Sequence, residues 1–178
     1  MKKYALDSNC IIDLFKENAS TQPAMKRIIE AYHEKKVDLV VSRHTVTEIL
    51  TPKKASAFVK KLKILPHYPI GQWNEQIASW DQCFASWNNS RENTEKEKLL
   101  KSLAKSGNDI RDRGAYIDAL YENADAFVTS DLQFAKREPA KRIEEKFGLK
   151  ILTPKQLSEM INIENKKEEP RSPQRYRS

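Results

Sequence analysis

The chain has little cysteine, no long apolar run and no repeated unit, and each shortage excludes a class of protein. Cys10 and Cys83 are the only cysteines among 178 residues, which argues against a disulfide framework and suits a reducing, cytoplasmic compartment. No apolar run approaches the ~20 residues that span a bilayer, so no membrane partner is expected. The apolar stretch after Lys3 is interrupted by Asp7, too early for a secretory signal.

The composition that remains is that of one globular domain with an excess of basic side chains. The sequence is 39% hydrophobic and 32% charged, and 32 basic against 25 acidic residues give a net charge of +7. This excess favours a polyanionic partner through counterion release, but a merely soluble basic protein has it equally. Residues 164–178 carry Arg171, Arg175 and Arg177 and almost no apolar side chain, so we expect a domain of residues 1–163 and a disordered tail.

Short apolar segments alternate with helical patterns along the chain. The expected strands are Lys3–Leu6, Val37–Val41, Ala126–Thr129 and Leu149–Leu152. The expected helices include Ser8–Glu17, a segment through Met25–Ile29, His44–Leu50 and Lys53–Lys61. This alternation predicts an α/β fold with a mainly parallel sheet, and ligands of such sheets gather at the carboxyl ends of the strands.

Two acids follow expected strands. Asp7 comes directly after the first strand, and Asp131 lies two residues beyond Thr129 at the end of a later one. A single acid in this position is usually the N-cap of the next helix. Two acids at equivalent places would share one edge of a parallel sheet, where they repel unless a cation neutralises them. Oxygen ligands of this kind suit Mg²⁺ or Mn²⁺.

Two helical segments supply further acids. Glu48 stands in an otherwise apolar turn soon after the second strand, which suggests that it points inward, although a surface glutamate is the plainer reading. The expected helix from residue 107 to 120 carries three acids. Asp109 and Asp112 share a face near its N-terminus, where the helix dipole favours negative charge. Asp118 points away from Asp112 and is expected to be solvated.

The order of these residues resembles that of PIN-domain ribonucleases. The matching features are the run Leu6–Asn9 after a first strand, a helical Thr47–Glu48, then Asp112–Arg113, Ala119–Leu120, Ala124–Asp125, Phe127–Asp131 and Phe134. The resemblance covers roughly residues 3 to 160, and its specificity comes from these short segments in this order. It implies a three-layer α/β/α fold with a central, mainly parallel sheet.

The resemblance also implies a function and a site. PIN domains bind one or two Mg²⁺ or Mn²⁺ ions and hydrolyse RNA, and many are the toxins of toxin–antitoxin pairs, so a cognate antitoxin is a possible partner. The matching metal-site acids are Asp7, Glu48, Asp112 and Asp131, with Asp109 as the runner-up to Asp112. Asn9 and Thr129 match the supporting polar residues. Arg111 and Arg113 flank the site helix, where they would either hold substrate phosphates or remain solvated.

Other readings stay open. Gly114 and Ala115 stand where the family often has larger residues or histidine, and the segment before Asp112 is long for a compact toxin. An inactive PIN fold that binds RNA or serves as a scaffold is one alternative. Another is a phosphoryl-transfer α/β protein, although a dehalogenase-type phosphatase needs an acid where Asn9 stands. The three histidines are scattered along the sequence and are expected to be structural or surface residues: His33, His44 and His67.

An expected helical insertion at about residues 70–106 has its own pattern. Trp73, Ile77, Trp80, Phe84 and Trp87 recur at spacings of four and three. Such a stripe is more often core than interface. A homodimer seam or an antitoxin-binding groove is the alternative.

Overall fold

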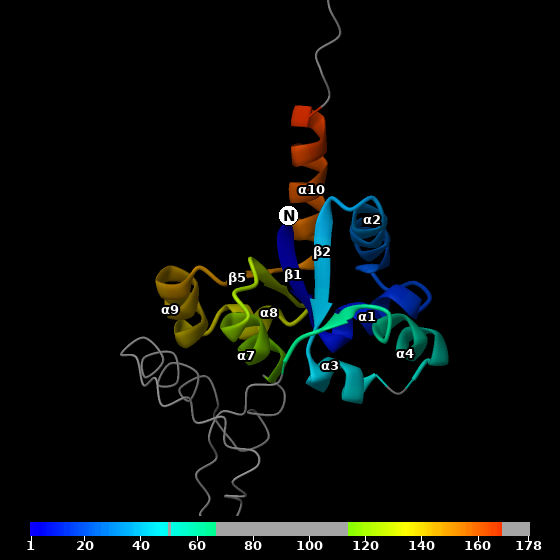
Figure 1. The fold of residues 1–178 in the computed structure, drawn as a ribbon, viewed down its shortest axis with the longest axis horizontal. Coiled ribbons are helices and arrows are strands. Elements are labelled where there is room, and N and C mark those ends of the chain that lie inside the picture. Colours follow the sequence, from blue (N-terminus) through cyan, green and yellow to red (C-terminus); the bar gives the residue numbers. More distant parts are fainter. Residues whose placement is uncertain (50, 67–113, 169–178) are drawn as a thin grey trace, which may run out of the picture.

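The sheet at the centre of the molecule is entirely parallel. The computed structural model describes residues 1–49, 51–66 and 114–168. Five strands are ordered β3-β2-β1-β4-β5 (Figure 1). They are β1 (Lys2–Leu6), β2 (Val37–Val41), β3 (Lys63–Ile64), β4 (Ala126–Val128) and β5 (Lys150–Leu152). The expected α/β class is therefore confirmed, with helices in the connections between strands.

Alternating side chains divide the core between the two faces of the sheet. Tyr4 and Leu6 of β1 point to one face, and Ala5 between them points to the other. The first face packs against α1 (Ser8–Phe15), α2 (Gln22–His33), α4 (Lys53–Val59) and α10 (Pro154–Glu168). The second packs against α7 (Gly114–Tyr121), α8 (Leu132–Ala135) and α9 (Glu138–Phe147). This is a three-layer α/β/α arrangement.

Local sequence signals explain where the helices begin and end. The side chain of Asp7 accepts a hydrogen bond from the Ser8 amide at the N-terminus of α1. Helix α9 ends at Gly148, whose φ of 74° is a left-handed conformation that glycine adopts at little cost. Among the described residues, no helix combines the length and apolar character needed to cross a membrane.

The expected elements differ from the structure mainly at their ends. All four predicted strands are present, but β3 was not predicted, because it has only two residues, Lys63 and Ile64, both exposed at the edge of the sheet. Helix α10 continues to Glu168 and so includes the start of the segment expected as a tail. The insertion expected at residues 70–106, with the stripe of Trp73, Trp80 and Trp87, lies outside the described residues.

Candidate active site at the carboxyl ends of the strands

Strand pairing brings the ends of β1 and β4 together. Leu6 pairs with Val128, and the Asp7 amide donates a hydrogen bond of 2.9 Å to the Val128 carbonyl. The next residues, Asp7 and Thr129, therefore leave the sheet side by side at its carboxyl edge. Two segments more than 120 residues apart in the chain meet here because both strands are parallel neighbours, as expected from the sequence.

A single hydroxyl connects the two strand-end acids. Thr129 Oγ1 donates a hydrogen bond of 2.6 Å to Asp7 Oδ2 and accepts one of 3.1 Å from the Asp131 amide. The Asp131 carboxylate is in turn held by the N-terminus of α8, where its Oδ1 accepts from the amides of Gln133 and Phe134. Asp7 and Asp131 thus lie at the same edge of the sheet, and each has one carboxylate oxygen fixed by backbone amides.

The third acid is carried by a short helix that is tied to β1. Helix α3 (Arg43–Glu48) begins at Ser42, whose Oγ accepts from the Thr45 amide at 3.0 Å. Thr45 Oγ1 donates to the Leu6 carbonyl at 3.3 Å, one residue before Asp7. Glu48, the last residue of this helix, is exposed. The expectation that it points inward is wrong, because α3 buries Thr45 and its C-cap Ile49 and leaves Thr47 and Glu48 exposed.

The electrostatic state of Asp7 reflects its surroundings. Burial raises the pKa of the Asp7 carboxyl above its usual 3.8, the hydrogen bonds from Thr129 and Ser8 lower it, and the Glu48 charge raises it again. Glu48 is therefore close enough to act on Asp7 although it is exposed. The net result is a carboxylate whose negative charge is poorly solvated by water. A cation bound beside it would stabilise that charge.

A second layer of polar groups surrounds the end of β4. Thr21 Oγ1 donates to Asp13 Oδ2 at 2.7 Å, and Ser130 Oγ donates to the same oxygen at 3.5 Å. Asp13 lies one turn of α1 after Asn9, so the two share a face of that helix. This i, i+4 spacing is the sequence signal that could have indicated Asp13, which was not among the predicted site residues.

The same layer includes a buried thiol. Cys10 Sγ donates to the Val128 carbonyl at 3.4 Å and lies 3.8 Å from Ser130 Oγ. Burial, together with the charges of Asp7 and Asp13, raises the pKa of this thiol far above its usual range. Cys10 is therefore a neutral packing residue of the site, without the thiolate character that a nucleophile needs.

Helix α7 lies at the boundary of what the structure describes. Asp109, Arg111, Asp112 and Arg113 are outside the described residues, so their roles stay predictions. Asp118 is fully buried, and the expectation of a solvated side chain is wrong because α7 packs on the sheet with nearly every residue inside. Gly114, at the start of α7, lies against the His44 ring of α3, which occupies the space that a side chain there would need.

The chemistry of the carboxyl edge fits a hard divalent cation. Asp7, Glu48 and Asp131 offer only oxygen donors, and the carboxylate of Asp7 is short of solvation. Within the described ranges, however, no three His, Cys, Asp or Glu side chains are grouped closely enough to hold a metal ion by themselves. A complete ligand set at this edge would therefore need a further donor or water, and the sequence offers Asp112, with Asp109 as the runner-up.

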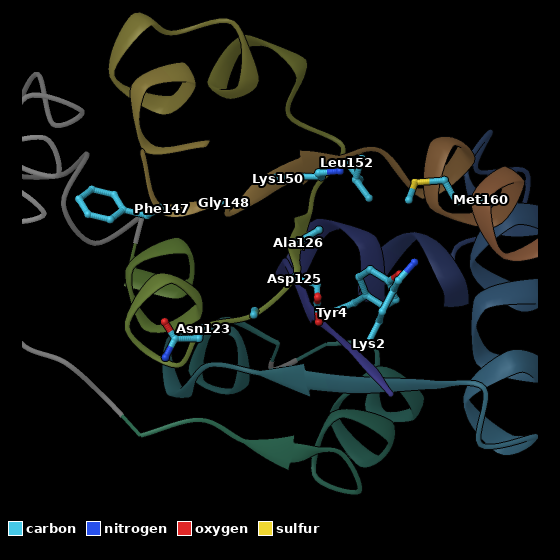
Figure 2. Close-up of a pocket in the computed structure, with 11 residues that line it drawn as sticks. Lys2, Tyr4, Asn123, Asp125, Ala126, Phe147, Gly148, Lys150, Leu152 and Met160 are labelled. Carbon is cyan, nitrogen blue, oxygen red and sulfur yellow. The ribbon is translucent and has the colours of Figure 1, made fainter. Parts of the chain in front are cut away.

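A hollow of the described surface lies elsewhere. A pocket of about 300 Å³ is located near the amino ends of β1, β4 and β5, where Lys2, Tyr4, Lys150 and Phe147 contribute to its lining (Figure 2). It contains none of the strand-end acids. Because ligands of parallel sheets bind at the carboxyl ends of the strands, the acidic edge remains the stronger candidate for chemistry.

Comparison with known proteins adds no relative. No family model matches the chain, and no curated protein matches its sequence.

Proposed function

We propose that this chain is a Mg²⁺- or Mn²⁺-dependent endoribonuclease of the PIN type, which hydrolyses phosphodiester bonds of RNA. The observation that carries the proposal is the hydrogen bond between Thr129 and Asp7, which joins the strand-end acids at one edge of a parallel sheet. The charge of Glu48, from a third element, acts on the same carboxylate. The resemblance to PIN domains supplies the reaction, since acids alone do not name a substrate.

Each residue of the proposed site has a specific part. Asp7 and Asp131 would be the direct ligands of the ion, and Glu48 and Asp112 would bind it directly or through water. When bound, the ion activates a water molecule and neutralises charge that develops on the phosphate. Thr129 fixes the Asp7 carboxylate, and the α8 amides fix that of Asp131, so that neither has to reorient during the reaction.

The biological setting follows from the same resemblance. We propose a cytoplasmic protein, and the toxin of a toxin–antitoxin pair is the role that we infer for it. An antitoxin would then be its protein partner, and a homodimer is compatible with the aromatic stripe around Trp80. These statements depend on the family resemblance and on composition.

The test is hydrolysis of RNA by the purified protein. We expect a 5′-labelled RNA to be cleaved with Mg²⁺ or Mn²⁺, and cleavage to stop when EDTA is added. Asp7→Asn should remove the activity, because it deletes a charged ligand with little change in volume. Asp125→Asn is the matched control: Asp125 lies at the opposite edge of the same strand pair, where it accepts a hydrogen bond from the Lys3 amide.

The outcomes separate the alternatives. Activity that persists in EDTA contradicts a metal-dependent site. If the protein binds RNA but hydrolyses none of it with either ion, the result would support the alternative of an inactive scaffold. Sequencing of the cleaved fragments would identify the preferred site, which the strand-end acids do not specify.

A further inference from the structure

The segment from Thr51 to Ile64 has a charge of one sign. It contains five lysines and no acid, and all five are exposed: Lys53, Lys54, Lys60, Lys61 and Lys63. Among the described helices, α4 is the one that carries basic residues and no acidic residue. Helix α9 shows the ordinary arrangement, since its bases alternate with Glu138, Glu144 and Glu145, and Arg142 is paired with Glu138 at 3.3 Å.

The fold holds this lysine surface in a defined position. Helix α4 buries Ala55 and Val59 against the core, and the Phe58 ring packs on Phe15 of α1 at 5.8 Å. Lys53 and Lys54 occupy the first turn of α4, Lys60 is its C-cap, and Lys61 and Lys63 follow in the next turn and in β3. The five ammonium groups therefore stand on one continuous segment, whose apolar side chains Ala55, Val59 and Leu62 are packed in the core.

The surface also lies close to the acidic edge. Helix α4 follows Glu48 after only four residues, and it packs against α1, the helix that begins at Asp7 (Figure 1). Lys63 stands in β3 opposite Val40, one residue before the carboxyl end of β2. A polymer that crosses α4 can therefore reach the strand ends without leaving the same side of the molecule.

The arrangement is unfavourable for the isolated fold. Lys53 and Lys54 occupy the first turn of a helix, where the dipole disfavours positive charge. No ion pair with an acid of the described residues compensates any of the five lysines. The outward positions of α4 are also free of large apolar side chains, which protein interfaces use as anchors. The lysines repel one another, and their surface has no apolar anchor for a protein partner. The phosphate backbone of a nucleic acid would neutralise such a surface.

We propose that these five lysines form the RNA-binding surface of the chain and guide a single strand across α4 to the acidic edge. The statement that the RNA is guided to the strand-end acids rests on the proposed function. The statement that the lysines bind RNA does not depend on it. The contacts are to phosphates, so the surface supplies affinity and direction while leaving base sequence unread.

Binding can be measured without hydrolysis. The probe is a fluorescein-labelled single-stranded RNA of mixed sequence, titrated in EDTA and followed by anisotropy at several salt concentrations. Lys53→Glu/Lys60→Glu should weaken binding at moderate salt by roughly tenfold or more, since two phosphate contacts become repulsive. Lys53→Gln/Lys60→Gln should reduce the slope of log K against log salt by about 1.4. The control, Lys141→Glu/Lys146→Glu on α9, changes net charge equally and should weaken binding much less.

The results distinguish this surface from the proposed activity. Hydrolysis of bis(p-nitrophenyl) phosphate with Mn²⁺ reports the acidic edge alone and should be the same in the α4 variants and wild type. Selective loss of RNA binding by the α4 variants supports the surface even where no hydrolysis is found. Equal loss in the α4 and α9 variants overturns it, as does an α4 variant that retains wild-type affinity. Circular dichroism melting shows whether each variant is folded. If the double glutamate variant is unfolded, the double glutamine variant provides the test of binding.

Discussion

Thr129 Oγ1 and Asp7 Oδ2 are 2.6 Å apart, and this is the shortest of the hydrogen bonds between β1 and β4 ends described above. The bond is side chain to side chain, so it depends on the identity of both residues and not on the sheet alone. The same hydroxyl accepts from the Asp131 amide. Removal of one oxygen atom would therefore leave both Asp7 Oδ2 and the Asp131 amide without this partner.

Thr129→Val tests this link. The change keeps the shape of the side chain but leaves Asp7 Oδ2 and the Asp131 amide without their partner. We expect the free energy of unfolding to fall by about 1–3 kcal/mol and metal-dependent activity to fall by about 10–100-fold. Thr153→Val is the control, because Thr153 follows β5 as Thr129 follows β4 and its hydroxyl bonds with Gln156. Activity unchanged in Thr129→Val would remove the hydroxyl from the site.

The raised pKa of Asp7 predicts how stability depends on pH. A carboxyl whose pKa is higher in the folded protein favours folding below its unfolded pKa of 3.8, and that contribution is lost as pH rises through the folded pKa. In EDTA at pH 7, Asp7→Asn should therefore be more stable than wild type. The advantage should shrink toward pH 4 and below, as urea unfolding at several pH values would show.

Metal should reverse the order of stability. Addition of Mn²⁺ at 100 times its Kd would stabilise wild type by about 2.7 kcal/mol and leave Asp7→Asn nearly unchanged. An advantage of the variant that is constant across pH would show that the Asp7 charge is not its cause.

The contact between Gly114 and His44 predicts a coupled pair of substitutions. Gly114→Ala would place a methyl group inside the space of the His44 ring and should cost about 1–3 kcal/mol. His44→Ala opens that space, so the double variant should lose less than the sum of the single losses. Gly148→Ala is the comparison, because its strain comes from a φ of 74° with open space around it. Its cost should simply add to that of His44→Ala.

The tryptophan stripe predicts a difference between folding and association. If Trp80 belongs to the core, as we expect, Trp80→Asp buries an unpaired charge and unfolds the protein. Size-exclusion chromatography with circular dichroism would detect this. A well-folded monomer, obtained from a wild-type dimer, would contradict the core assignment and identify the stripe as a seam.

The sequence predicted those features that depend on periodicity and chain order. Short β-branched segments that alternate with helical patterns identified the strands. The parallel sheet that this alternation predicts then placed Asp7 and Asp131 at one edge. Side-chain direction on short helices was not predicted in the same way. Glu48 ends a six-residue helix and Asp118 lies in a helix buried on nearly all sides, so neither has the amphipathic pattern that indicates exposure. The Thr21–Asp13 contact joins a loop to a helix, and no local pattern encodes it.

The lengths of the outer strands have a consequence for behaviour at high concentration. β3 has two residues and β5 has three, whereas β1 and β2 have five each. Sheet edges with unpaired amides can template another chain, but two or three residues offer few such groups, and each outer strand presents an exposed lysine, Lys63 or Lys150. If a second copy approached with the same edge, the exposed lysines of the two copies would repel each other. The short strand would also offer too few backbone groups for a stable ladder of hydrogen bonds. The sheet is therefore protected against edge-to-edge aggregation.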